Sequence, residues 1–211
     1  QALRNEAVDP ASIYVTGNSV IDALHLTHAR VAAEPDLVQA IQPVLDRHAG
    51  KRIILITTHR RENFGAGLDH ILAQLPDVAC ILPMHLNPNV RPIVEKRLSS
   101  IESVSLVEPL DYPSFTWLLW HSYLVLTDSG GVQEEAPAFG KPVLVMRETT
   151  ERPEGVAAGT ARLVGTDTAK IVRETNRLLD DGDAYSAMAR AHNPFGDGQS
   201  AARIADLLAT A

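Results

Sequence analysis

Apolar runs recur along the chain and predict the strands of a parallel sheet. Residues 53–58 form an almost unbroken run of β-branched residues and leucine that ends in polar residues, and residues 123–127 repeat the pattern. Such runs are typical of strands buried on both faces. Further apolar runs of this kind lie at residues 79–82, 104–107 and 143–146.

The stretches between these runs can form helices, so strand and helix alternate. Residues 168–181 and 201–211 carry apolar side chains at helical spacing and should form amphipathic helices. The Pro- and Gly-containing loop at 192–198 aims the last helix separately from the body. This alternation predicts an α/β, Rossmann-like fold: a parallel sheet with flanking helices that binds ligands beyond the carboxyl ends of its strands.

Composition places the chain among ordinary globular proteins. It has 211 residues, 45% of them hydrophobic and 21% charged, and a formal net charge of -7, so we expect no nucleic acid partner. The apolar stretch at 117–126 contains His121 and Ser122 and is too short for a membrane span. Cys80, the single cysteine, is expected in the core, which fits a reducing, cytoplasmic location. The start at Gln1 suggests an excised domain.

The residues after the fourth of these strands, in chain order, have the pattern of an anion-binding turn. Ser129, Gly130 and Gly131 lead from that strand into a helix. Glycines let the backbone approach a phosphate, and the first helical turn offers amides and a favourable dipole. Glu135, about one turn later, could accept hydrogen bonds from ribose hydroxyls. A plain turn capped by Asp128 or Ser129 is the alternative interpretation.

A second polar cluster follows the first predicted strand. His59, Arg60 and Arg61 should therefore lie at the same edge of the sheet. An imidazole can donate to a phosphate oxygen or move a proton near neutral pH, and guanidinium groups match phosphates. A solvated loop with Arg–Glu pairs is the alternative.

The other predicted strands also lead into segments that could contact a ligand. His85 follows the second strand, where a loop histidine with internal hydrogen bonds is an equal interpretation. After the third strand, the backbone of residues 109–115 and the Phe115 ring could hold a nucleobase, although core packing accounts equally for Phe115. Arg152, after the fifth strand, could clamp a phosphate or a sugar hydroxyl. No histidine pair has a recognised metal-ligand spacing, so we expect no metal site.

Several long motifs, in order, resemble the bacterial non-hydrolysing UDP-N-acetylglucosamine 2-epimerases. The motifs cover nearly the whole chain and lie at residues 16–24, 58–65, 83–90, 127–137, 140–159 and 191–198. Two departures stand out: residues 59–85 are about two helical turns shorter than the family pattern, and Leu110 stands where some members carry glutamine.

The resemblance implies a two-domain GT-B type fold, with this chain as its second half. It divides the chain into a hinge region and first helix (1–25), a Rossmann-like UDP-binding domain (26–195) and a C-terminal helix (196–211), with the N-terminal domain absent. By motif, the substrate-binding residues are His59, Leu110, Phe115, Ser129, Gly130, Gly131, Glu135 and Arg152. His59 is also the implied catalytic residue, and Arg60 and His85 are implied to bind a second, allosteric UDP-N-acetylglucosamine.

The implied activity is the interconversion of UDP-N-acetylglucosamine and UDP-N-acetylmannosamine at C2 through elimination and re-addition of UDP, without a cofactor. The family's proton-transfer acids belong to the N-terminal domain, so this chain alone is expected to be inactive. The implied partners are UDP, UDP-N-acetylglucosamine, the missing N-terminal domain and a second copy in a homodimer. A stand-alone UDP-sugar-binding module and a GT-B glycosyltransferase domain are the alternatives; residues 59–62 and 150–154 favour the epimerase.

Overall fold

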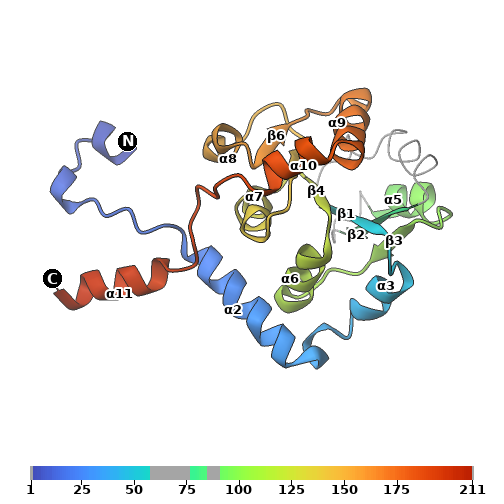
Figure 1. Ribbon diagram of the computed structural model, residues 1–211, viewed down its shortest axis with the longest axis horizontal. Helices are drawn as coiled ribbons and strands as arrows, with labels where there is room; N and C mark the ends of the chain where they lie inside the picture. Colours follow the sequence, from blue (N-terminus) through green and yellow to red (C-terminus); the bar gives the residue numbers. More distant parts are fainter. Residues whose placement is uncertain (1, 58–76, 85–90, 211) are drawn as a thin grey trace.

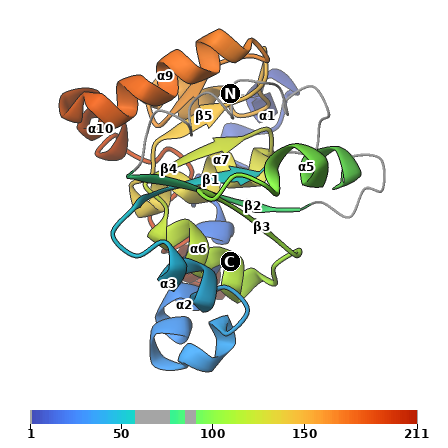
Figure 2. The same cartoon turned by 90° about the vertical axis from the view of Figure 1, so that its right-hand side faces the viewer.

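The computed structural model describes residues 2–57, 77–84 and 91–210. Within these residues the chain forms a parallel β-sheet covered by helices on both faces (Figures 1 and 2). The strands are β1 (Arg52–Thr57), β2 (Val78–Pro83), β3 (Val104–Val107), β4 (Leu124–Thr127), β5 (Val143–Val145) and β6 (Ala161–Leu163). Every apolar run that predicted a strand forms one, and β6 is an additional strand at the edge.

The strand order is β3-β2-β1-β4-β5-β6, with every neighbouring pair parallel. The chain therefore winds outward from β1 in one direction, then returns to place β4 on the other side of β1. This reversal is the doubly wound Rossmann topology, and its ligands bind where the direction changes. The α/β, Rossmann-like prediction is confirmed.

From β2 to β6, each strand is connected to the next by helix, while α1 to α3 precede β1 and α9 to α11 follow β6. The α-helices are α1 (Ala2–Asn5), α2 (Ser19–Ala33), α3 (Gln42–Arg47), α5 (Arg91–Leu98), α6 (Tyr112–His121), α7 (Gly130–Glu135), α8 (Pro153–Ala158), α9 (Thr168–Asp180), α10 (Gly182–Ala189) and α11 (Ser200–Thr210). Short 3-10 helices are η1 (Pro10–Ser12), η2 (Pro35–Val38) and η4 (Ala136–Phe139). The two predicted amphipathic helices correspond to α9 and α11.

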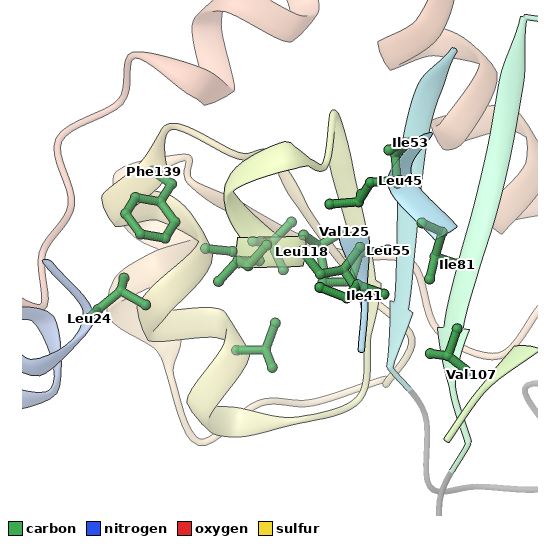
Figure 3. Packing of buried hydrophobic residues seen from close by; sticks show 14 of the residues in the cluster. Leu24, Ile41, Leu45, Ile53, Leu55, Ile81, Val107, Leu118, Val125 and Phe139 are labelled. Carbon is green, nitrogen blue, oxygen red and sulfur yellow. The ribbon is translucent and has the colours of Figure 1, made fainter. Parts of the chain in front are cut away.

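Two hydrophobic clusters hold the layers together, one on each face of the sheet. Alternate residues of each strand point to opposite faces, so Ile54 joins the cluster with α5, α9 and α10. Leu55 joins the cluster with α2, α3, α6 and α7. Figure 3 shows Leu55 and Val125 from the sheet beside Leu118 from α6. Cys80 lies in the first cluster, as predicted, and burial raises the pKa of its thiol to about 12.

The start and the end of the chain meet at one side of the sheet. The backbone N–H of Asn18 donates to the carbonyl of Phe195 at 2.7 Å, just before α2 and α11 begin. Helix α11 and the N-terminal segment then extend away from the sheet together (Figure 1). The last helix is thus directed separately from the body, as the loop at 192–198 predicted.

Candidate functional site

The carboxyl ends of β1 and β4 meet at the point where the strand order reverses. Their last residues, Thr57 and Thr127, are paired in register, and their hydroxyl oxygens lie 2.7 Å apart. The Thr127 hydroxyl also accepts a hydrogen bond from the backbone N–H of Ser129 at 2.9 Å. The end of the sheet therefore shapes the turn that follows β4.

This turn leaves the start of α7 open. Ser129 occupies the N-cap position, yet its side chain makes no capping hydrogen bond. A side chain built on Gly131 would meet nothing within 4 Å. Neither Gly130 nor Gly131 has a positive φ, so what these glycines contribute is clearance rather than an unusual backbone conformation. The first helical turn has N–H groups without an intrahelical acceptor, which an anion can use.

The charged segment after β5 is tied to α7 through Gln133. The Gln133 amide donates to the Ser129 carbonyl at 3.0 Å and accepts from the Thr150 hydroxyl at 2.6 Å. The Thr150 hydroxyl in turn accepts from the backbone N–H of Arg152 at 3.0 Å. Two loops from neighbouring strands are thereby fixed against one another.

Arg152 lies directly beside the glycine turn. Its Nη2 is 3.9 Å from the position that a Cβ on Gly130 would occupy, while its Nε donates to the Glu134 carboxylate. Ser129, Gly130, Gly131 and Arg152 are therefore brought together, as their motifs suggested. A guanidinium and a helix N-terminus at one point form a favourable environment for a phosphate group.

Glu134 and Glu135 are both 7% exposed, yet they face different partners. Glu135 accepts a hydrogen bond from the Tyr112 hydroxyl at 2.8 Å. Burial raises the pKa of Glu135, the Tyr112 hydrogen bond lowers it, and the charge of Glu134 raises it. Glu134 instead accepts from Arg152 and from the Asn18 side chain, the latter at 2.6 Å.

The segment proposed for a nucleobase lies at the start of α6. Asp111 caps this helix by accepting from the Ser114 backbone N–H at 2.9 Å. Leu110 and Phe115 are half-buried and pack against the core cluster that includes Leu118. Their contacts with the core support the packing interpretation, and in the sequence they lie within three residues of Tyr112, which donates to Glu135.

Three candidate residues, His59, Arg60 and His85, lie outside the described residues, so their roles stay predictions. Conversely, sequence reasoning did not single out Tyr112 or the contacts of Glu134. Tyr112 precedes Glu135 by 23 positions and Asn18 precedes Glu134 by 116, so no local pattern joins either pair.

Within the described part of the chain, no helix has the length and apolar character that crossing a bilayer requires. The same residues contain no group of three or more His, Cys, Asp or Glu side chains suited to a metal ion.

The strand order and the open turn at its reversal define a doubly wound, Rossmann-like α/β domain. A family model described as UDP-N-acetylglucosamine 2-epimerase matches residues 1–209. The chain therefore belongs to the UDP-N-acetylglucosamine 2-epimerase family, as its motifs indicated, rather than to the glycosyltransferases of similar architecture.

Individual relatives agree with the family match. The UDP-N-acetylglucosamine 2-epimerase of Salmonella typhimurium is 51% identical over 99% of this chain and 57% of its own length. The Neisseria meningitidis UDP-GlcNAc 2-epimerase, solved bound to UDP-GlcNAc, superposes with a TM-score of 0.90 at 39% identity, covering 99% of this chain and 58% of that one. A Staphylococcus aureus structure described as an MnaA-UDP co-structure has a TM-score of 0.84 at 41% identity, with 98% and 56% covered.

The chain spans about half the length of the curated relatives it matches and corresponds to their C-terminal half. Its sheet is thus the second of the two Rossmann-like units of a GT-B type fold.

Proposed function

We propose that this chain forms the UDP-binding half of an enzyme that interconverts UDP-N-acetylglucosamine and UDP-N-acetylmannosamine. The observation that carries the proposal is the meeting of an uncapped glycine turn, Arg152 and a buried carboxylate at the reversal of the sheet. The N. meningitidis relative bound to UDP-GlcNAc and the S. aureus relative with UDP support the ligand class.

Each part of the nucleotide has a proposed place. The turn at Ser129, Gly130 and Gly131 would hold the diphosphate through backbone N–H groups and a hydroxyl, with Arg152 beside it. Glu135 would accept hydrogen bonds from the ribose, because an ionised carboxylate only accepts and a ribose offers two hydroxyl donors. The segment containing Leu110 and Phe115 would hold the uracil, and His59 would act near the phosphates.

The proposed reaction proceeds by elimination and re-addition. The C1–O bond to UDP breaks as the C2 proton leaves, which gives a 2-acetamidoglucal and free UDP. Protonation of C2 from the opposite face and re-addition of UDP at C1 then give the epimer. This chain would stabilise the negative charge on departing UDP, which preorganised N–H groups and a guanidinium do effectively away from water.

The part of the relatives that this chain does not span would supply the acid and base groups that move the proton at C2. The N-terminal segment and α11 offer an apolar surface for that part: a groove of about 460 Å³ is lined by Leu3, Ile13, Tyr14, Ile204, Leu207 and Leu208 among others. In the proposed organisation, residues 26–195 form the UDP-binding domain, residues 1–25 the hinge region and first helix, and residues 196–211 the C-terminal helix.

Calorimetric titration of the chain with UDP tests the nucleotide site. We expect saturable binding that weakens about tenfold or more in Glu135→Ala and to a smaller extent in Ser129→Ala, because hydrogen bonds to charged groups contribute about 1.5–3 kcal/mol. Exposed Glu102→Ala and Ser99→Ala are the matched controls and should bind as the wild type does. The proposal would be contradicted if the folded wild-type chain bound no UDP. It would also be contradicted if the two site variants and the two controls all bound UDP with equal affinity.

A further inference from the structure

Tyr112 is the direct hydrogen-bond donor to Glu135. It is the first residue of α6, and its hydroxyl lies 2.8 Å from Glu135 Oε1. The Tyr112 side chain reaches the surface, with the residue 39% exposed, whereas Glu135 is 7% exposed. The hydrogen bond therefore joins a buried carboxylate to the side chain of a partly exposed residue.

The geometry leaves Glu135 able to bind a second partner. A carboxylate has about four lone-pair positions on two oxygens, and the Tyr112 hydroxyl uses one of them. Oε1 and Oε2 can therefore still accept from neighbouring hydroxyls of a ribose. The hydrogen bond from Tyr112 also offsets part of the cost of burying the charge beside Glu134, since its effect on the pKa of Glu135 opposes that of burial.

Tyr112 is held at this position by the start of its helix. The Asp111 carboxylate accepts from the Ser114 N–H, and the Asp111 carbonyl accepts from the Phe115 N–H at 2.9 Å. Pro113 occupies the first turn, where its fixed φ suits a helix, and Leu110 packs on the core. A side chain on such an anchored turn can hold its partner in one orientation.

We propose that Tyr112 is a positioning residue that orients Glu135 toward the two ribose hydroxyls and so makes the site selective for ribonucleotides. This inference rests on the proposed function and deepens it, because it assigns sugar selectivity to a pair of side chains. The Tyr112 hydroxyl acts through Glu135 and needs no contact with the reacting carbons.

A double-mutant cycle read with two nucleotides tests the inference. Wild type, Tyr112→Phe, Glu135→Gln and the double variant are titrated with UDP and with 2′-deoxy-UDP. We expect wild type to prefer UDP by about tenfold, Tyr112→Phe to reduce that preference to about threefold or less, and Tyr112→Phe to have no further effect in the Glu135→Gln background. Tyr185→Phe, which removes a hydroxyl bonded to the Tyr123 carbonyl away from the turn, should keep the wild-type preference.

The outcomes separate the two proposals. If wild type binds UDP and Tyr112→Phe keeps the full preference over 2′-deoxy-UDP, the role of Tyr112 is overturned while the nucleotide site stands. An equal loss for both nucleotides also overturns it, since that pattern indicates a general structural effect. A wild-type chain that binds neither nucleotide contradicts the proposed function itself. Thermal unfolding of Tyr112→Phe should show a modest fall in the melting temperature, because the buried Glu135 carboxylate loses one donor, while the variant stays folded at the temperature of the titration.

Discussion

Neighbouring glutamates of α7 perform different tasks because their surroundings differ. Glu135 faces Tyr112, whereas Glu134 accepts from Arg152 and, at 2.6 Å, from Asn18. The Glu134 side chain is only 9% exposed and that of Arg152 is 36% exposed. Glu134 therefore joins the arginine beside the glycine turn to the segment where α2 begins.

Removal of this carboxylate should cost stability. Glu134→Ala removes the carboxylate that accepts from Arg152 Nε and from the Asn18 side chain, and we expect the free energy of unfolding to fall by about 2 kcal/mol. Urea denaturation measures the change. Glu151→Ala is the matched control, because Glu151 pairs with Arg147 and its side chain is 59% exposed, so its loss should cost less than about 1 kcal/mol. Equal costs for the two variants would contradict this account.

Helix α2 holds the beginning of α11. The Asp22 carboxylate accepts from the backbone N–H groups of Ser200, at 3.1 Å, and Ala201, at 2.9 Å. These are N–H groups of the first turn of α11, which have no partner within their own helix. A side chain 178 residues away in the sequence therefore caps the last helix.

Loss of this cap should loosen α11. Asp22→Ala is expected to increase amide hydrogen exchange several-fold in α11, beginning at Ser200 and Ala201, whereas Asp206→Ala on an exposed position should not. The hydrogen bond from Ala201 is the main cause that lowers the pKa of Asp22 below 3.8. Because the folded-state pKa is lowered, the stabilisation is fully present above pH 3.8 and is lost as the pH falls through the lowered pKa. Unchanged exchange in Asp22→Ala would rule out the capping role.

The two terminal segments of the molecule together expose apolar side chains. Leu208 is 74% exposed and Tyr14 is 64% exposed, and both line the groove between α11 and the N-terminal segment. Exposed apolar grooves commonly mark interaction sites. Tyr14 also lines a neighbouring cavity together with Glu134 and Arg152, so the groove adjoins the residues beside the glycine turn.

Mixing this chain with the separately produced N-terminal part of the Salmonella relative should restore epimerase activity that neither piece has alone. Conversion is measured by separating the two UDP-sugars. Leu208→Asp should weaken the complex, so that about tenfold or more of the N-terminal part is needed for half-maximal conversion. The affinity of the chain for UDP should stay unchanged. Leu26→Asp is the matched control, because Leu26 is 72% exposed on α2 outside the groove. A stable complex without conversion would instead support a binding module without catalytic activity.

The apolar runs of the sequence predicted five of the strands, including β3 at one edge of the sheet, and missed β6 at the other edge. Strands β1, β2 and β4 are buried along most of their length, so continuous apolar runs identify them. Strand β6 has three residues, of which only Ala161 is buried, and it leaves no such run. Helix α10 was likewise not predicted, because Met188 is its one buried residue.

The same division applies to the site. The spacing of Ser129, Gly130, Gly131 and Glu135 within one turn and one helix is local, so the chain's own order determines that they lie together. The pairing of Glu135 with Tyr112, and of Glu134 with Asn18 and Arg152, depended on the order of the parallel strands and on the meeting of the chain's two ends. Burial patterns specify which residues form elements, but packing between elements decides which distant side chains meet.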